Sequence, residues 1–222
     1  MCGRFDNHLP KMLGWADMLA SWPDVPLSYN VAPSSKIAAF ATESGESMRW
    51  GMVPAWSKRF SSKYATFNAR LESVAEKPTF RNAWKRRQRC LIPMAGYYEW
   101  QAGPSGKQPF YITDRNVGGL VAAGLYERWT GEHQSEQSVS CSVSCTMITK
   151  PADPGLDRIH KRMPVLLTPD SALQWLGNSG EENFLFDCVS PEIVYWPVST
   201  AVGNVRNNHQ RLSEAIDLEP KQ

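Results

Sequence analysis

Apolar residues along this chain of 222 residues occur mostly in short runs, bounded by Gly, Pro, Asp and Ser. Runs of this length with these boundaries are typical of β-strands rather than of helices. The pattern predicts strands over residues 37–41, 90–95, 109–113, 119–126, 139–149, 165–167 and 193–198. Most of the middle of the chain is therefore expected to form β-structure.

Two stretches instead predict helices. Between His8 and Trp22, apolar residues recur at a spacing that gives one apolar helix face. The triplet Thr168-Pro169-Asp170 combines an N-cap hydroxyl with a proline at the first helical position, and it predicts a helix through Leu176. Because strands outnumber helices and no strict βαβ alternation is present, we expect an α+β fold, a mainly antiparallel sheet or barrel with flanking helices.

The chain is expected to form a single domain over residues 1–222, with a polar tail from about Arg211. Its composition, 42% hydrophobic and 21% charged residues, is that of a soluble globular protein. No apolar run reaches the roughly 18–20 residues that a membrane-spanning helix needs, and the start MCGRFDNHLP lacks the apolar core of a signal peptide. A cytoplasmic protein with reduced thiols is therefore predicted. The cysteines are Cys2, Cys90, Cys141, Cys145 and Cys188.

The formal net charge of +2 conceals an uneven distribution. Residues 1–90 hold 14 Lys and Arg against 7 Asp and Glu, whereas residues 91–222 hold 10 against 15. The stretch from Arg81 to Arg89 contains five basic residues and no acid. A basic half with tryptophans nearby is a weak indication of a polyanionic partner, and a solvated helix face is the alternative.

The common catalytic signatures are missing from the sequence. It contains no glycine-rich phosphate loop, no HExxH metal motif and no GxSxG nucleophile motif. The cysteines form no CxxC pair, so neither a metal site nor a cofactor is predicted. Any chemistry is therefore expected from a less common arrangement.

Cys2 is the most unusual candidate, because loss of Met1 would make it the N-terminal residue. An N-terminal cysteine carries its thiol next to an α-amine, whose ordinary pKa is about 7.7–8.0. The amine can condense with an aldehyde to an imine, and the thiol can then close on the imine carbon to give a five-membered thiazolidine. No internal cysteine or lysine carries both groups. The alternative is that Cys2 is merely a small residue at the start of a strand.

Seven short motifs follow one another along the chain. They are Met1-Cys-Gly-Arg4, Asn30-Val-Ala-Pro33, a loop over 50–56 with two tryptophans, Asn68-Ala-Arg70, Glu99-Trp100, His160-Lys-Arg162-Met-Pro164 and Val202-Gly-Asn-Val205. With these motifs in this order, most of the sequence resembles the SOS response-associated peptidase (SRAP) family, which senses abasic sites in single-stranded DNA. It departs from the family's pattern after Arg70, where Leu-Glu-Ser follows, and in an insertion over 130–138.

The resemblance implies a covalent mechanism. It makes Cys2, after loss of Met1, the nucleophile that crosslinks to the ring-opened sugar of an abasic site, with Asn68 beside the Cys2 amine. It also implies that Glu99 and His160 are catalytic. An imidazole exchanges protons near neutral pH, so His160 suits opening of the sugar ring, and Glu99 suits dehydration of the carbinolamine. The same site would remove Met1 by self-cleavage, and β-elimination from the imine would appear as abasic-site lyase activity.

Other residues are expected to contact the DNA. Arg4, Arg70 and Arg162 are candidates for phosphate contacts, because a guanidinium forms paired hydrogen bonds to phosphate oxygens. Trp56 and Trp100 are candidates for stacking on exposed bases. The set of expected DNA-binding residues is Arg4, Asn30, Trp56, Arg70, Trp100 and Arg162.

The expected partner is single-stranded DNA containing abasic sites, bound by a monomer, with replication-fork proteins as a second partner class and no membrane. Two other functions stay open. A conventional cysteine protease would use Cys2 and His160, with Glu99 or Asn68 as the orienting group. A non-catalytic nucleic-acid-binding protein would use only its basic half, and its binding would not depend on Cys2.

Overall fold

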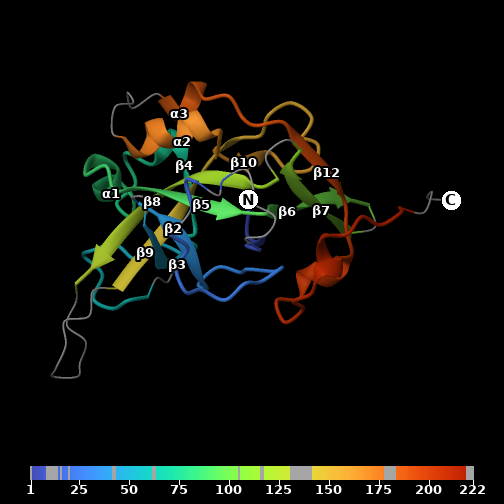
Figure 1. The fold of residues 1–222 in the computed structure, drawn as a ribbon, viewed down its shortest axis with the longest axis horizontal. Helices are drawn as coiled ribbons and strands as arrows, with labels where there is room; N and C mark the ends of the chain where they lie inside the picture. Colours follow the sequence, from blue (N-terminus) through green and yellow to red (C-terminus); the bar gives the residue numbers. More distant parts are fainter. Residues whose placement is uncertain are drawn as a thin grey trace.

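The computed structural model describes residues 2–8, 15, 17–19, 21–41, 44–61, 64–104, 106–115, 118–130, 142–177 and 184–218. Its strands form two sheets of different size (Figure 1). The strands of the larger sheet are β2 (Lys36–Phe40), β3 (Gly45–Trp50), β4 (Asn68–Arg70), β5 (Arg89–Met94), β8 (Leu120–Trp129), β9 (Ser142–Pro151), β10 (Arg162–Pro164) and β11 (Leu166–Leu167). Their order is β10-β9-β3-β2-β5-β8-β11, and β4 pairs with β9.

The larger sheet closes into a five-stranded barrel. Because β8 pairs with both β5 and β9, the strands β9, β3, β2, β5 and β8 form a ring. Most ladders are antiparallel, but β3 and β4 run parallel to β9. Successive residues of β2 point to opposite faces, as a strand requires: Ala38 and Phe40 belong to one apolar cluster, and Ile37 and Ala39 to the other.

Short helices cover one side and one end of the barrel. Figure 1 shows α2 (Pro169–Leu176) and α3 (Phe184–Asp187) together above the barrel, and α1 (Arg81–Lys85) at its far end. A reciprocal capping box starts α2: the Ser171 N–H donates to Thr168 Oγ1 at 3.3 Å, and the Thr168 N–H donates to Ser171 Oγ at 2.8 Å. Trp175 anchors the helix, because its indole N–H donates to the carbonyl oxygen of Cys90 in β5 at 3.2 Å.

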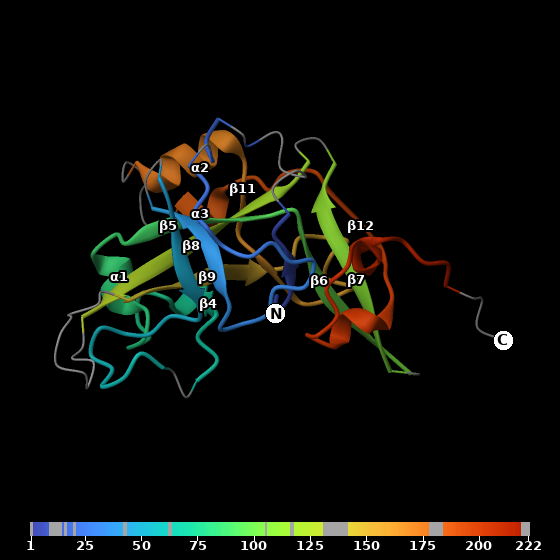
Figure 2. The same cartoon turned by 60° about the horizontal axis from the view of Figure 1, so that its bottom comes forward.

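The smaller sheet holds the start of the chain against the barrel. It consists of β1 (Phe5–Asp6), β6 (Gly96–Gly103), β7 (Gly106–Asp114) and β12 (Ile193–Pro197), in the order β1-β6-β7-β12. In Figure 2 the first residues run between the barrel and the strands β6 and β7. Phe5 lies opposite Tyr97 of β6 and also exchanges backbone hydrogen bonds with Val31. The N-terminal segment is therefore fixed from two sides.

The predicted α+β architecture with a mainly antiparallel, barrel-like core is confirmed. The predicted strands match β2, β5, β7, β8, β9, β11 and β12 within the described residues, and the helix predicted after Thr168 is α2. Most of the helix predicted between His8 and Trp22 lies outside the described residues, as does the insertion from residue 131 onward.

Two local features differ from the prediction. The predicted strands left residues 96–103 outside β-structure, whereas these residues form the strand β6, which carries Glu99. The segment predicted as a polar tail from about Arg211 is docked at its start, where Leu212 is fully buried and the indole N–H of Trp196 donates to the Ser213 carbonyl oxygen at 2.9 Å, and residues 214–218 are exposed. A single buried leucine in a polar segment gives no periodic signal.

Among the described residues, no helix combines the length and the apolar character that crossing a membrane requires.

Candidate active site

Cys2 is fully buried between the barrel and the smaller sheet. Its thiol lies 3.8 Å from the carbonyl oxygen of Arg4, and that same oxygen accepts a hydrogen bond from the Tyr98 N–H of β6 at 3.0 Å. Trp50 of the barrel and Tyr97 of the smaller sheet belong to the same apolar cluster as Cys2. The surroundings thus fix the position of Cys2 from both sheets.

Asn68 connects Cys2 to the barrel. It is the first residue of β4, which pairs with β9, and its side chain is buried. The amide Nδ2 donates to the carbonyl oxygen of Cys2 at 2.7 Å. The amide oxygen of Asn68 is buried and has no hydrogen-bond partner among the described residues. The amide nitrogen of Asn68 therefore holds the Cys2 carbonyl oxygen, and its amide oxygen is an acceptor without a partner among the described residues.

Glu99 and His160 meet beside Cys2. Glu99 is 4% exposed on β6, and its Oε1 lies 3.7 Å from the imidazole Nδ1 of His160. His160 comes from the turn before β10, where its Nδ1 accepts the N–H of Arg162 at 3.0 Å. Its side chain is 32% exposed. A buried carboxylate next to a partly exposed imidazole is an arrangement through which protons can pass between solvent and an enclosed site.

The electrostatics of the site keep the Cys2 thiol neutral. Burial raises the pKa of the Cys2 thiol well above its usual range, and the negative charge of Glu99 raises it further. Reactive thiolates normally lie in electropositive surroundings that lower their pKa. The surroundings of Cys2 have the opposite effect, so its thiol is not preformed as a thiolate.

Each candidate arginine lies two positions from a candidate catalytic residue, but the three differ in their partners. Arg4 donates to the Gly3 carbonyl oxygen at 2.9 Å, and no carboxylate of the described residues pairs with it. Arg70 is exposed at the end of β4. Arg162 is held in a two-point ion pair by Glu72, with Nη1–Oε1 and Nη2–Oε2 distances of 2.6 and 2.9 Å.

A family model described as SOS response associated peptidase (SRAP) matches residues 1–205, and thus all of these positions. The chain belongs to this family. The abasic site processing protein YoqW of Bacillus subtilis is 32% identical to it over 97% of this chain and all of its own. The abasic site processing protein HMCES of Xenopus tropicalis is 33% identical over 78% of this chain and 58% of its own. A solved structure from Bordetella bronchiseptica superimposes with a TM-score of 0.75 at 26% identity, covering 89% of this chain and all of its own.

The remaining expected DNA contacts of this SRAP chain occupy different surroundings. Trp56 is 62% exposed in the loop after β3, and Trp100 is half-buried next to Glu99. Asn30 is buried, and its Nδ2 faces the carbonyl oxygens of Val202, Asn204 and Asn207 at 3.0–3.2 Å. In this structure the Asn30 side chain therefore ties the C-terminal segment to the N-terminal one instead of facing solvent.

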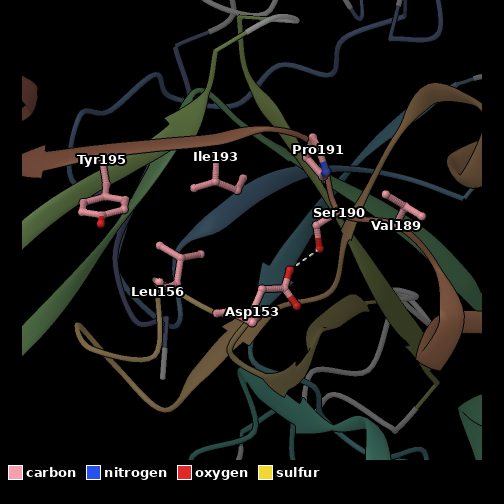
Figure 3. Close-up of a pocket in the computed structure, with 9 residues that line it drawn as sticks. Asp153, Leu156, Val189, Ser190, Pro191, Ile193 and Tyr195 are labelled. Carbon is pink, nitrogen blue, oxygen red and sulfur yellow. Dashed lines mark hydrogen bonds between the residues drawn. The ribbon is translucent and has the colours of Figure 1, made fainter.

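A pocket of about 530 Å³ lies between residues 153–156 and the segment 189–195 (Figure 3). Its lining includes Leu156 on one side and Ile193 and Tyr195 of β12 on the other. At its edge the Ser190 hydroxyl donates to Asp153 at 2.6 Å. None of the predicted site residues lines this pocket, and no group of three potential metal-ligating side chains occurs among the described residues.

Glu72, which follows the Asn68-Ala-Arg70 motif, has a role that the sequence did not predict. The only sequence signal was its place two residues after Arg70. The structure makes it the ion-pair partner of Arg162, 90 residues away in the chain. Similarly, the stretch Arg81–Arg89 is not one uniform basic surface, because Arg89 is buried and its guanidinium stacks 4.4 Å from the ring centre of Trp175.

Proposed function

We propose that this protein senses abasic sites in single-stranded DNA and captures them covalently through Cys2 once Met1 has been removed. The observation that carries the proposal is the convergence of Cys2, Asn68, Glu99 and His160, from four separate segments, around one buried point. The family relationship adds support, because relatives of similar length are named abasic site processing proteins.

The chemistry starts at the amine. Loss of Met1 exposes the α-amine of Cys2, and the open amide oxygen of Asn68 can accept one of its N–H bonds. His160, which reaches solvent, supplies and removes the protons that open the sugar to its aldehyde. The amine nitrogen then bonds to the aldehyde carbon and gives up one proton, while the former carbonyl oxygen takes up a proton, which gives a carbinolamine.

Glu99 completes the reaction as an acid and base. It donates a proton to the carbinolamine hydroxyl, which leaves as water as the C=N bond forms, and the nitrogen then returns its proton to the Glu99 carboxylate to give the neutral imine. The Cys2 sulfur then bonds to the imine carbon, while its proton passes to the nitrogen, and the thiazolidine ring closes. Met1 release uses the same carboxylate to activate the attacking group on the Met1 carbonyl carbon.

The neutral thiol favours this sequence over a conventional cysteine protease. A protease attacks with a preformed thiolate, whereas burial and Glu99 raise the pKa of the Cys2 thiol. In the proposed mechanism the amine attacks first and the sulfur adds later to a strongly electrophilic imine carbon. If β-elimination breaks the imine intermediate before the ring closes, the strand is cleaved, and this gives an associated lyase activity.

The DNA would bind along the arginines and exposed aromatic rings that surround Cys2. Arg4 and Arg70 form no ion pair with a carboxylate of the described residues, so their guanidinium groups can donate hydrogen bonds to phosphate oxygens. Trp56, exposed in its loop, offers a surface on which a base can stack regardless of sequence. A single strand suits this site, because a duplex would keep its sugar away from a buried residue.

The deciding experiment mixes the purified protein with single-stranded DNA that contains one abasic site, without borohydride. We expect an adduct that survives a denaturing gel, and an intact mass equal to both components minus water and without Met1. Cys2→Ser keeps the amine but closes rings poorly, so it should need borohydride to give an adduct and should cleave the strand more. A stable adduct from Cys2→Ser without reductant, or from protein with a retained N-terminal extension, would exclude the thiazolidine. Binding without any adduct would favour the non-catalytic function.

A further inference from the structure

The ion pair between Arg162 and Glu72 occupies the part of Arg162 that would bind a phosphate. Nη1 and Nη2 donate to the two carboxylate oxygens at 2.6 and 2.9 Å, and Nη2 also donates to the Thr149 carbonyl oxygen at 2.7 Å. A carboxylate and a phosphate both bind this planar pair of N–H groups through two parallel hydrogen bonds. A phosphate can therefore reach this pair of donors only by displacing Glu72.

The two members of the pair differ in how freely they can move. The Arg162 side chain is 15% exposed and held by Thr149 of β9, so it stays in place. Glu72 is 41% exposed on the short helical turn Leu71–Ser73 and can swing into solvent. The hydrogen bond from Arg162 also lowers the pKa of the Glu72 carboxyl, so Glu72 is ionised at neutral pH. Arg162 therefore keeps its position, whereas the Glu72 carboxylate can leave the ion pair.

We propose that Glu72 is a specificity-determining residue, an internal competitor that occupies the phosphate-binding face of Arg162 and weakens binding to undamaged single-stranded DNA. This inference rests on the proposed function, since it assumes that DNA passes the site. Arg4 and Arg70 form no ion pair with a carboxylate of the described residues, although the charge of Arg70 also acts on Glu72, and these two arginines supply the first contacts. Arg162 joins only when a strand stays long enough to displace Glu72, as a strand captured through Cys2 does.

The test measures equilibrium binding of an undamaged oligothymidylate, which cannot crosslink, over a range of salt concentrations. Glu72→Gln removes the carboxylate, so that Nη1 and Nη2 of Arg162 can bind a phosphate. We expect about two- to fivefold tighter binding, the range that a partly exposed ion pair represents, and a slope of log K against log salt that steepens by about 0.7 for one added phosphate contact. Glu72→Asp, which shortens the side chain but keeps the charge, should fall between Glu72→Gln and wild type.

Two controls separate this competition from the general effect of removing a negative charge. Glu76→Gln removes a charge from the same exposed segment, where Glu76 has no ion pair with a described residue, and should leave the slope unchanged. In an Arg162→Gln background, Glu72→Gln should no longer steepen the slope. An unchanged slope for Glu72→Gln, or equal gains in both backgrounds, would overturn the inference while leaving the proposed function intact. Failure of the wild type to bind any single strand would instead overturn the proposed function.

Discussion

In the proposed mechanism, proton transfer depends on two residues with different access to solvent. Glu99 is nearly fully buried, whereas the His160 side chain is about one-third exposed and lies 3.7 Å from Glu99. The buried carboxylate can act only on groups inside the site, and the imidazole can exchange protons with water. This difference suggests separate steps for the two residues, with sugar opening at His160 and dehydration at Glu99.

Single substitutions should separate these two steps. Glu99→Gln keeps the shape and hydrogen bonding of the side chain but transfers no proton. We expect it to retain Met1, to bind DNA as well as wild type and to form adduct about 10²–10⁴ times more slowly, the usual contribution of general acid–base catalysis. His160→Gln should process Met1 at least partly and slow only adduct formation.

Parallel time courses of Met1 loss, by mass spectrometry, and of adduct formation, on denaturing gels, measure both effects. Binding of undamaged DNA by each variant is the control for folding. Wild-type rates of Met1 loss and adduct formation in Glu99→Gln would show that Glu99 is a structural carboxylate.

The sequence was enough to propose these residues as a site, but not to predict their contacts. Cys2 stands out because its backbone amine and thiol become adjacent groups once Met1 is gone, and this needs no three-dimensional information. The orientation of the Asn68 amide depends on the register between β4 and β9, which places Asn68 opposite Met147. The three residues of β4 contain no sequence pattern that would specify this register. For the same reason, the sequence could not predict that Arg162 pairs with Glu72, because the pair joins β10 to the turn after β4.

At the scale of elements, the site depends on the passage of the chain from the barrel into the smaller sheet. β5 ends at Met94, and β6 begins at Gly96 and carries Glu99. A Cβ atom at Gly96 would lie 2.4 Å from Cζ of Tyr111 and 2.8 Å from the carbonyl oxygen of Ile112. Glycine is required here because the ring of Tyr111 in β7 lies directly against the backbone.

Gly96→Ala should therefore destabilise the fold and disturb the active site together. Overpacking of this kind costs about 1–3 kcal/mol, and the strain would fall on the strand that positions Glu99. Gly103→Ala is a matched control on the same strand, since its nearest neighbour would be 3.5 Å away. Urea unfolding measures the stability, and adduct formation measures the site. Equal free energies of unfolding for the two variants would show that β7 moves aside for the added methyl group without loss of stability.

Elements with a strong local signal were predictable, and those that depend on tertiary contacts were not. Thr168 and Pro169 predict the start of α2, and the structure shows the corresponding capping box. β3 was missed because its sequence, GESMRW, is polar over most of its length. It becomes a strand through its pairing with β2 and β9. The barrel itself follows from the pairing of β8 with β9, a long-range contact across the insertion.

At the scale of the whole molecule, the two sheets create an interior in which several thiols are held neutral. Burial raises the pKa of Cys2, Cys90 and Cys145 above the usual range. Cys145 lies on β9 and Cys90 on β5, both strands of the barrel. Because folding buries these thiols, we expect the free energy of unfolding to depend on pH in the alkaline range.

The sign of this linkage follows from where the proton is held. Each thiol keeps its proton in the folded protein, whereas in the unfolded chain it ionises at about pH 8.5. Its contribution to stability is therefore complete below that pH and is lost as the pH rises toward the folded pKa. Above pH 8.5 the free energy of unfolding should fall by up to about 1.4 kcal/mol per pH unit for each such thiol.

Replacing one of these thiols should make the alkaline loss of stability less steep. Cys145→Ala removes one ionising group, so its free energy of unfolding should fall by about 1.4 kcal/mol less per pH unit than that of wild type above pH 8.5. The cavity left by the substitution lowers stability by the same amount at every pH, and does not change the slope. Urea unfolding between neutral pH and pH 10 measures both slopes, and their agreement near pH 7, where the thiols are neutral in both states, is the control. Parallel curves throughout the alkaline range would mean that Cys145 ionises as readily inside the barrel as in the unfolded chain, and that the interior admits charge.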